Sequence, residues 1–409
     1  MQMPAIRFQG FTEEWEENVL DSLFSKIKNA FVGTATPYYL AEGHFYLESN
    51  NVKNGQINRN SEIFINDFFY KKQEDNWLHT DDIVMVQSGH VGHSAVIPPE
   101  LNNTAAHALI IFADKKKKIC SYFLNYQFQT DITKALISNI TTGNTIKHIL
   151  SSEMKKFKVI LPQATEQIQI GSYFQNLDKL ISLHQAKYNK LVNLKKAMLE
   201  KMFPKHGEDE PEIRFKGFEG AWEEKELGKV AEVRTGFPFD SNEFGYDGEY
   251  LVITNGNIQN ESPYVDITTG NRISIRNETV IREYVLNLND ILVTMDGTVG
   301  RTAKVVNRNQ ILAQRVGRLT ANSNSDFLYY VLNTGDFYKN MVLISSGGTI
   351  KHISLNEISS YLIKLPKFKE EEQKVGSYFQ NLDKLITLHQ NELDKLNHLK
   401  KACLEQMFV

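Results

Sequence analysis

One five-residue segment, Thr-Ile-Lys-His-Ile, occurs twice in the chain, and its side chains suit contact with a phosphate group. It occupies residues 145–149 and returns at 349–353, each time shortly after a glycine. A glycine turn followed by Thr, Lys and His can present backbone N–H groups and cationic side chains to an anion. Packing of the segment against a helix explains the repetition equally well, so both roles stay open. The residues concerned are Thr145, Lys147, His148, Thr349, Lys351 and His352.

Sequence patterns for catalysis are absent. The chain has no phosphate-binding Gly-x-x-x-x-Gly-Lys-Ser/Thr, no Asn/Asp-Pro-Pro-Tyr/Phe tetrapeptide of amino-methyltransferases, and no His-Glu-x-x-His or Cys-x-x-Cys. His90 and His93 have the spacing of a metal pair, but the corresponding residues in the second half of the chain are Thr298 and Arg301. A required metal site would not vary in this way between duplicates, so we expect a non-catalytic chain that binds no metal.

The composition is that of a globular protein and does not by itself indicate the class of molecule that the protein binds. The 409 residues include 46 Lys+Arg and 49 Asp+Glu, for a formal charge of −3. This balance argues at first against nucleic acid, although a net charge averages over faces that can differ. Two cysteines are too few for a disulfide framework, so we expect a cytoplasmic protein. We also expect no signal peptide and no membrane span, because no apolar run approaches ~18 residues.

Whole blocks of the sequence return roughly 205 residues later, which indicates tandem duplication of one unit. Between these blocks, residues 20–140 and 228–345 share little beyond their pattern. Two modules that share their flanking blocks but differ in their central residues suggest that both perform the same task on two different targets. The repeated blocks are 4–11 with 211–218, 171–181 with 376–386, and 194–203 with 399–408.

The last part of each repeat has the heptad spacing of a long helix, and two equal seams in one chain favour pairing as an antiparallel coiled coil. The alternative is an amphipathic helix that packs only on its own module. Polar residues at 184, 195, 389 and 400 interrupt the seams, and we interpret them as register-setting positions rather than ligands. The predicted seam residues are Phe174, Leu177, Ile181, Tyr188, Leu191, Met198, Phe379, Leu382, Ile386, Leu393, Leu396 and Met407.

Each module alternates short apolar strands with turns and a few helices. The sequence therefore predicts an α+β fold with two similar globular modules, twisted mixed or antiparallel sheets, and two long helices that separate them. A pseudo-two-fold relation would follow from the duplication. The expected strands are 82–86, 108–113 and 157–161 with 290–294, 316–319 and 361–365, and the expected helices are 121–126 and 326–332.

The order of these parts resembles the specificity (S) subunit of type I restriction–modification systems. The resemblance rests on two divergent modules, two near-identical helices, the opening Ile-Arg-Phe-x-Gly-Phe with Trp-Glu, and the Leu-Pro and Glu-Gln that lead into each helix. One departure is that Glu166-Gln167 corresponds to Glu372-Gln373 displaced by one residue. The implied divisions are target recognition domain 1 (1–163), spacer helix 1 (164–204), a linker (205–211), target recognition domain 2 (212–365) and spacer helix 2 (366–409).

The resemblance implies partners and a division of labour. Each recognition domain would read one half of a split, asymmetric sequence in double-stranded DNA. The helices would set the spacing and dock two methyltransferase (M) subunits, through which restriction (R) subunits can join. S-adenosylmethionine, ATP and Mg²⁺ would then belong to these partners, with no cofactor bound by this chain.

Loop residues able to hydrogen-bond base edges or phosphates are the candidates for DNA contact, although for any one of them a solvated surface role is the alternative. Only Arg7 and Arg59 lie in residues 1–163, whereas nine arginines lie in 205–365, so guanine contacts are expected mainly in the second half-site. Turns at Ser88-Gly89 and Asp296-Gly297 would bring Thr298 and Arg301 to DNA. The remaining candidates are Lys28, Asn29, Lys53, Asn54, Arg59, Arg234, Asn257, Arg272 and Arg276.

Two further functions are weighed against this one. A self-contained DNA enzyme would need the methyltransferase tetrapeptide or a nuclease carboxylate–lysine cluster, and neither is visible. A structural coiled-coil protein without nucleic acid would have similar rather than divergent modules. The sequence therefore favours a DNA-recognition and scaffold subunit.

Overall fold

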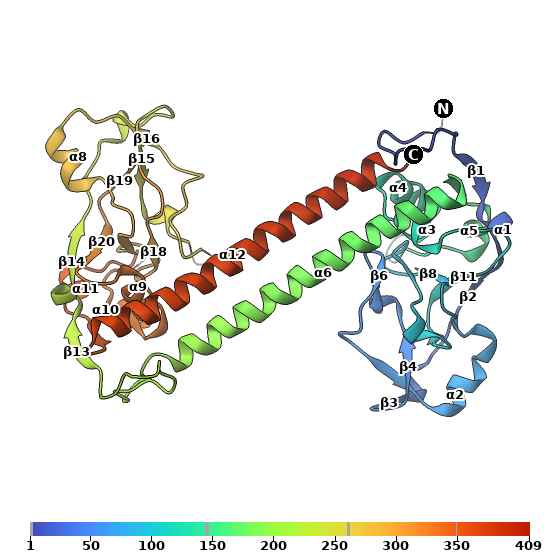
Figure 1. Ribbon diagram of the computed structural model, residues 1–409, viewed down its shortest axis with the longest axis horizontal. Helices are drawn as coiled ribbons and strands as arrows, with labels where there is room; N and C mark the ends of the chain where they lie inside the picture. The colour runs from blue at the N-terminus through green and yellow to red at the C-terminus, as the bar shows by residue number, and fades with distance from the viewer. Residues whose placement is uncertain (1–2, 144–146, 260–261, 349) are drawn as a thin grey trace. The chain divides into compact units, whose positions relative to one another are not determined.

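The computed structural model describes residues 3–143, 147–259, 262–348 and 350–409, and Figure 1 traces them from blue to red. The chain divides into two compact units, the first formed by residues 1–185 with 391–409 and the second by 186–390. Each unit thus combines one module with the closing segment of the other repeat's long helix. The linear domain boundaries given above stay a prediction. Among the described helices, none has the length and apolar character needed to cross a bilayer.

The first unit contains two four-stranded sheets, in the orders β2-β11-β8-β9 and β10-β4-β7-β3. Its pairs are antiparallel except for β10 with β4. Its strands are β1 (Glu16–Val19), β2 (Phe24–Asn29), β3 (Tyr39–Leu40), β4 (His44–Leu47), β5 (Val52–Lys53), β6 (Gln56–Ile57), β7 (Ile63–Ile65), β8 (Ile83–Val86), β9 (Ser94–Val96), β10 (Ala105–Ala106), β11 (Leu109–Lys115) and β12 (Lys158–Leu161). Its short helices are α1 (Leu20–Leu23), α2 (Asp67–Lys72), α3 (Ser121–Gln127), α4 (Asp131–Asn139) and α5 (Ser151–Lys156).

The second unit repeats this plan with the orders β14-β20-β17-β18 and β16-β15-β19, and its parallel pair is β15 with β19. The mixed, mostly antiparallel sheets expected from the sequence are therefore confirmed. Its strands are β13 (Glu223–Glu226), β14 (Ala231–Thr235), β15 (Tyr250–Ile253), β16 (Arg272–Ile273), β17 (Ile291–Thr294), β18 (Thr302–Lys304), β19 (Gln310–Leu312), β20 (Val316–Ala321) and β21 (Leu362–Leu365). Its short helices are α7 (Leu227–Val230), α8 (Glu278–Tyr284), α9 (Ser325–Thr334), α10 (Phe337–Ile344) and α11 (Leu355–Ser359).

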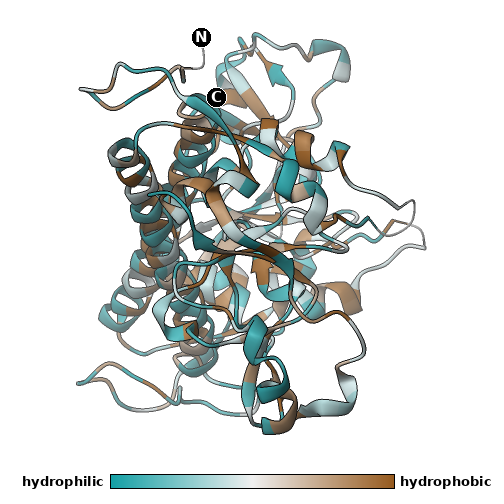
Figure 2. Cartoon of the chain, turned by 90° about the vertical axis from the view of Figure 1, so that its right-hand side faces the viewer, coloured by the Kyte–Doolittle hydropathy of each residue, from teal (hydrophilic) through white to brown (hydrophobic). Residues whose placement is uncertain are grey.

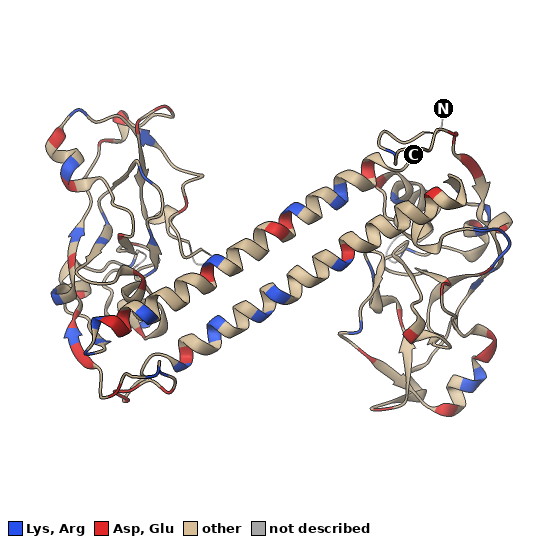
Figure 3. Ribbon diagram, viewed as in Figure 1, with Lys and Arg blue, Asp and Glu red and all other residues tan. Residues whose placement is uncertain are grey.

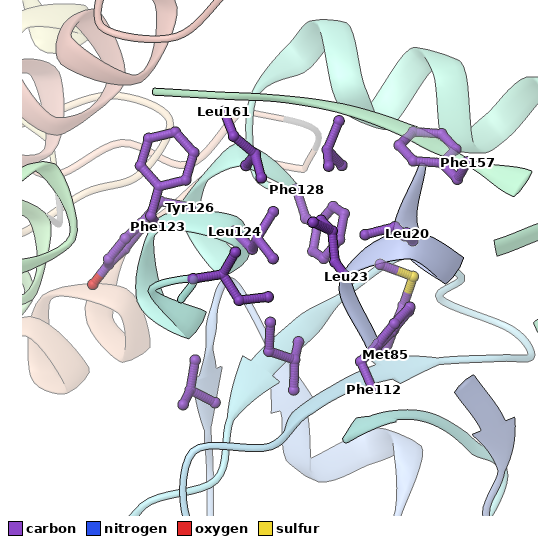
Figure 4. Close-up of a cluster of buried hydrophobic side chains, with 14 of the residues drawn as sticks. Leu20, Leu23, Met85, Phe112, Phe123, Leu124, Tyr126, Phe128, Phe157 and Leu161 are labelled. Atoms are coloured by element: carbon purple, nitrogen blue, oxygen red, sulfur yellow. The ribbon is translucent and has the colours of Figure 1, made fainter. Parts of the chain in front are cut away.

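The central strand of each module is buried on both faces, because alternate side chains of a strand point to opposite sides of the sheet. In β8, Ile83 and Met85 pack in the core below α3 and α5, while Val84 and Val86 pack in a second core. Figure 4 shows the first of these cores, with Met85 and Phe112 beside Leu20 and Leu23. β17 divides its side chains between two cores in the same way. These apolar runs are the strands that the sequence predicts.

The long helices α6 (Ala164–Lys201) and α12 (Lys369–Gln406) have 38 residues each, which corresponds to about 57 Å at 1.5 Å per residue. Figure 2 shows apolar and polar residues alternating along them. Gly171 and Gly376 lie where each helix meets the start of the module's own α3 or α9. A Cβ at Gly376 would lie 2.8 Å from the Phe327 backbone nitrogen, and one at Gly171 3.2 Å from that of Phe123. This close approach explains why the helices retain a glycine.

A buried ion pair joins the opening motif of each repeat to its helix start. The Arg7 guanidinium donates to both carboxylate oxygens of Glu166, at 2.6 and 2.8 Å. Arg214 does the same to Glu371, at 2.7 and 2.8 Å. The glutamate equivalent to Glu166 is therefore Glu371, which corrects the sequence-based match to Glu372. Bidentate pairing of this kind is directional as well as charged, so it fixes the angle at which the chain enters the helix.

The helices pack antiparallel within each unit. In the first unit the Tyr173 hydroxyl lies 3.4 Å from Cys403 Sγ, and the Phe174 ring packs against the Phe408 ring with their centroids 5.8 Å apart and their planes tilted by 37°. Matching contacts in the second unit join Phe203 to Phe379. Antiparallel helix pairing is thus confirmed inside each unit. Of the predicted seam residues, Phe174, Leu177, Phe379, Leu382, Leu393 and Met407 are buried, and Ile181, Tyr188, Leu191, Met198, Ile386 and Leu396 are half-buried.

Each of the two lysines that interrupt the seams forms an ion pair with an aspartate of the facing helix. Lys400 lies 2.7 Å from Asp178 in the first unit, and Lys195 lies 2.5 Å from Asp383 in the second. Each aspartate also accepts a hydrogen bond from a tyrosine hydroxyl of the module, Tyr126 at 2.8 Å or Tyr330 at 2.6 Å. Burial, followed by the nearby carboxylate, raises the pKa of both tyrosines, so each hydroxyl stays protonated and donates.

Replacing one partner of the Lys195–Asp383 ion pair tests how much the pair contributes to the free energy of unfolding. Lys195→Met leaves the buried Asp383 carboxylate uncompensated, and we expect the free energy of unfolding to fall by about 3 kcal/mol. Adding Asp383→Asn removes the orphaned charge, so the double variant loses less than Lys195→Met alone, measured by urea denaturation. Lys395→Met, which breaks an exposed pair with Glu392 on the same helix, is the control and changes stability by less than about 0.5 kcal/mol. Additive losses in the double variant would show that the two side chains are not coupled.

Candidate functional site

The repeated Thr-Ile-Lys-His-Ile segment is hydrogen-bonded to the turn that follows the central strand. In the first unit the Gly89 amide donates to the Lys147 carbonyl at 3.1 Å, and the Ile149 amide donates to the Gln87 carbonyl at 2.9 Å. The second unit has the same two bonds, from Gly297 to Lys351 and from Ile353 to Met295, both 2.9 Å. The segment and the turn therefore form one surface element in both modules.

The two roles left open for this segment belong to different residues. Ile149 and Ile353 are fully buried in the module cores, so packing explains the isoleucine. The lysine and histidine of each copy are exposed beside the turn, where they are accessible to a ligand. Thr145 and Thr349 lie outside the described residues.

The predicted turns are confirmed by their backbone. Gly89 and Gly297 have φ angles of +80° and +72°, a region that glycine enters without a steric penalty. Thr298 is exposed on the second turn. Arg301 is half-buried, and its Nε finds no hydrogen-bond partner among the described residues.

The strand register places several candidates at the same end of each sheet. Asn29, at the end of β2, pairs with Ile110 at the start of β11, and the turn 87–93 leaves β8 at that end. In the second unit, Arg234 near the end of β14 pairs with Arg318 near the start of β20. We call this the strand-end face of each module. It gathers Lys28, Asn29, Lys147 and His148 in the first unit, and Arg234, Thr298, Arg301, Lys351 and His352 in the second.

Some candidates of the first module are already engaged within the protein. The Lys28 ammonium donates to the Asp75 carbonyl, and burial lowers its pKa. Arg59 is paired with Glu62 at 2.6 Å and lies over the Phe45 ring, 4.7 Å from its centroid. Lys53 and Asn54 are exposed on the β5–β6 hairpin. The backbone N–H of Asn54 donates to His93 Nδ1 at 3.3 Å, so the hairpin lies against the turn after β8.

The second module uses two of its candidates to shape loops. Arg272 donates to the Gly248 and Glu249 carbonyls at 2.6 and 3.0 Å, whereas Arg276 is exposed. Arg234 is exposed and paired with Glu232 at 2.5 Å. Asn257 is buried, and its amide donates to the Asp266 and Thr269 carbonyls, both at 2.9 Å. Its amide is thus used within the fold, and we withdraw Asn257 from the candidate DNA surface.

Asn51 and Asn257 have the same structural role, which the sequence interpretation missed. Asn51 is also buried, and its amide donates to the Asn58 and Ser61 carbonyls at 2.9 and 2.8 Å. Both asparagines close a capped single turn, the first with Glu48 and the second with Thr254. The sequence did contain a signal for this role, because the two asparagines occupy corresponding positions in the two repeats. A residue that both modules keep is more easily explained by a role in folding than by contacts with two different DNA sequences.

An acidic residue on the second strand-end face contacts both a histidine and an arginine. The Asp296 carboxylate accepts from His352 Nδ1 and lies 3.1 Å from the Arg315 guanidinium. The Asp296 side chain is 14% exposed, whereas that of Arg315 is 66% exposed. Arg315 was not among the sequence candidates, because no repeated motif contains it. Only the excess of arginine in the second module pointed towards it.

A groove beside the first strand-end face is lined by two lysines and two histidines. It has a volume of about 280 Å³ and runs between the turn after β8 and helix α4, with Lys134, Lys147, His90 and His93 on its walls. Burial lowers the pKa of His93, so this ring favours its neutral form. Among the described residues, no three His, Cys, Asp or Glu side chains are placed to hold a metal ion.

Comparisons with known proteins agree on one family. A family model described as type I restriction modification DNA specificity domain matches residues 12–193 and again 219–398. The type I restriction enzyme MjaVIII specificity subunit of Methanocaldococcus jannaschii is 24% identical, over 97% of this chain and 92% of that protein. The putative MjaX specificity subunit of the same organism is 23% identical, over 97% and 93%. The crystal structure of a type I restriction-modification S subunit from M. genitalium has the same fold, with a TM-score of 0.67, 15% identity, and coverage of 100% and 99%.

Two substitutions separate packing from contact in the repeated segment. Ile149→Ala removes buried apolar volume, so we expect the free energy of unfolding to fall by about 2–5 kcal/mol. Lys147→Ala should leave stability within about 0.5 kcal/mol. It should weaken DNA binding and reduce the slope of log K against log salt by about 1, as expected for one phosphate contact.

The matched pair Ile353→Ala and Lys351→Ala should behave alike in the second unit. Unfolding is followed by urea denaturation and DNA binding by titration at several salt concentrations. A Lys147→Ala variant that is destabilised yet binds DNA with an unchanged salt slope would assign the lysine to packing.

Proposed function

This chain belongs to the type I restriction modification DNA specificity domain family, of which it carries two copies, and we propose that each copy reads one half of a split DNA target. The observation that carries the proposal is the strand-end face. In both modules the same backbone frame presents the same exposed lysine and histidine, while the surrounding residues differ. Constant residues suit phosphate contacts that set the register, and variable ones suit base contacts that specify the sequence.

The chain is a specificity subunit, as its curated relatives are named, and we propose that it has no catalysis of its own. We propose that methylation of adenine with S-adenosylmethionine, and cleavage that uses ATP and Mg²⁺, are performed by partner subunits. Figure 3 shows Lys and Arg residues interspersed with Asp and Glu residues along the ribbons of both units. Affinity for phosphates therefore depends in part on these partners, since counterion release scales with the number of cations in contact.

Exposed leucines on the long helices support docking of two methyltransferase subunits. In the first unit Leu180, Leu183 and Leu399 are 44%, 48% and 45% exposed. Their counterparts in the second unit, Leu385, Leu388 and Leu194, are 43%, 51% and 38% exposed. Repeated apolar exposure of this kind is typical of protein–protein contact surfaces. Two equal sets suit two copies of the same partner.

The unbroken helices support a role in setting the distance between the half-sites. Each helix continues for 38 residues from its own module into the other compact unit. A helix resists bending far more than a loop, so we propose that α6 and α12 fix the number of unread base pairs in the target.

Exchange of one module tests the two-reader proposal. Residues 20–140 are replaced by the corresponding segment of another family member, which leaves the helices and the repeated blocks in place. We expect the methylated motif to change in one half only, as mapped by modification-sensitive sequencing of host DNA. Replacing 228–345 should change the other half. A change in both halves after a single exchange would contradict the proposal.

Charged substitutions on the helices test the docking of two partners. Leu183→Asp should remove one methyltransferase subunit and Leu183→Asp with Leu388→Asp should remove both, because a buried unpaired charge weakens an interface by at least about tenfold. The mass of the purified complex measures the number of bound subunits. Leu136→Asp, at a leucine of α4 that is 49% exposed, is the control. Retention of both partners in the double variant would place the docking surface elsewhere.

A further inference from the structure

The residue before β20 has a backbone conformation that side chains rarely adopt. Arg315 has a φ angle of 70°, and Ala108, before β11 in the first module, has a φ angle of 54°. The carbonyl of each residue accepts a hydrogen bond from the end of the central strand, from Met295 at 3.2 Å or Gln87 at 3.3 Å. The conformation therefore belongs to the shared frame of the two modules.

A side chain at this position carries a cost. The left-handed region costs a residue other than glycine roughly 1–2 kcal/mol, and glycine would avoid it. Such strain persists where the surrounding structure imposes it, and it concentrates at functional sites. The Arg315 side chain is 66% exposed, so core packing does not offset this cost, and a contact with a ligand outside the unit would.

The contact with Asp296 orients the Arg315 guanidinium and leaves its other N–H donors available for a ligand. A guanidinium has five N–H donors in a rigid fork, and one of its terminal nitrogens lies 3.1 Å from the Asp296 carboxylate. An ion pair with one partner 66% exposed stabilises a fold very little. Asp296 is itself held by His352 of the repeated segment, so the arginine is tied to the element that both modules keep.

The first module has the same frame with different side chains. His148 is retained, whereas Ser88 stands at the position of Asp296 and Ala108 at that of Arg315. Neither serine nor alanine can form the ion pair. The two faces thus differ in chemistry at one backbone position whose geometry is common to both.

We propose that Arg315 reads a guanine in the half-site of the second module, with Asp296 and His352 holding its guanidinium in place. The proposal rests on the function proposed above. Arginine donates two parallel hydrogen bonds to O6 and N7 of guanine in the major groove, which no other base accepts. Asp296 restricts the arginine side chain before binding, which lowers the entropy lost on contact. Arg315 is thus a specificity residue, and Asp296 and His352 are positioning residues.

Glycine and lysine at position 315 separate base reading from structure. Arg315→Gly relieves the backbone and removes the donors, so we expect thermal stability to be unchanged or raised. The preference for guanine at one position of the second half-site should fall by about 5- to 150-fold, the range of a bidentate base contact. Arg315→Lys keeps the charge and can still donate to guanine but loses the rigid fork, so we expect a smaller loss of preference and of overall affinity than in Arg315→Gly. The readouts are DNA competition with each base at every position and the methylation motif, both with the complete complex.

Asn309→Gly is the matched control. Asn309 also has a left-handed backbone, with a φ angle of 60°, and is exposed in the same unit. Its replacement by glycine should leave the recognised sequence unchanged. Asp296→Asn should weaken the guanine preference less than Arg315→Gly does.

Three outcomes would overturn the inference. The first is an unchanged guanine preference in Arg315→Gly. The second is an equal loss of affinity for all sequences, which would assign Arg315 to a phosphate. The third is a second half-site without guanine. If module exchange still alters a single half of the motif, each of these leaves the proposed function standing. If Arg315→Gly changes the first half-site, the assignment of one module to one half fails instead.

Discussion

A buried aspartate on each long helix binds a lysine supplied by the other repeat, and the architecture of both units depends on these two ion pairs. Asp178 and Asp383 lie in the segment that the repeats share without change, and Lys195 and Lys400 lie in the next shared segment. An unpaired carboxylate at these depths would be costly, so the helices have to meet in the one register that supplies a lysine to both. The tyrosine hydroxyl from the module completes each site and ties the register to the globular part.

This constraint explains which parts of the sequence can differ between the repeats. The helices, the arginine–glutamate pairs at their starts and the buried isoleucine of the repeated segment all contribute to packing inside a unit. The strand-end face is attached to this frame by backbone hydrogen bonds, which do not depend on side-chain identity. Side chains on the face can therefore change without loss of the fold, and Ala108 and Arg315 illustrate how far they do.

The sequence predicted the features that repeat or have a period. The family resemblance, the strands around Ile83 and Ile291, the helix seams and the glycine turns are confirmed, because each leaves a pattern of apolar residues or an internal copy. Asn257 failed as a candidate because a polar type in a loop does not reveal burial. Arg315 was missed because its importance comes from a backbone angle and from Asp296, which is distant in sequence. Such contacts are set by tertiary structure alone.

The division of the helices between the units has a consequence for the order of folding during synthesis. The core of the first unit includes Cys403, Met407 and Phe408, and Phe408 packs against Trp15, Phe123 and Phe174. These residues are translated after the whole of the second unit, residues 186–390. The second unit has no such delay, because the part of α6 that belongs to it, residues 186–201, is translated before its module. The module translated first is therefore completed after the second, because its core needs residues that follow the whole second unit in the chain.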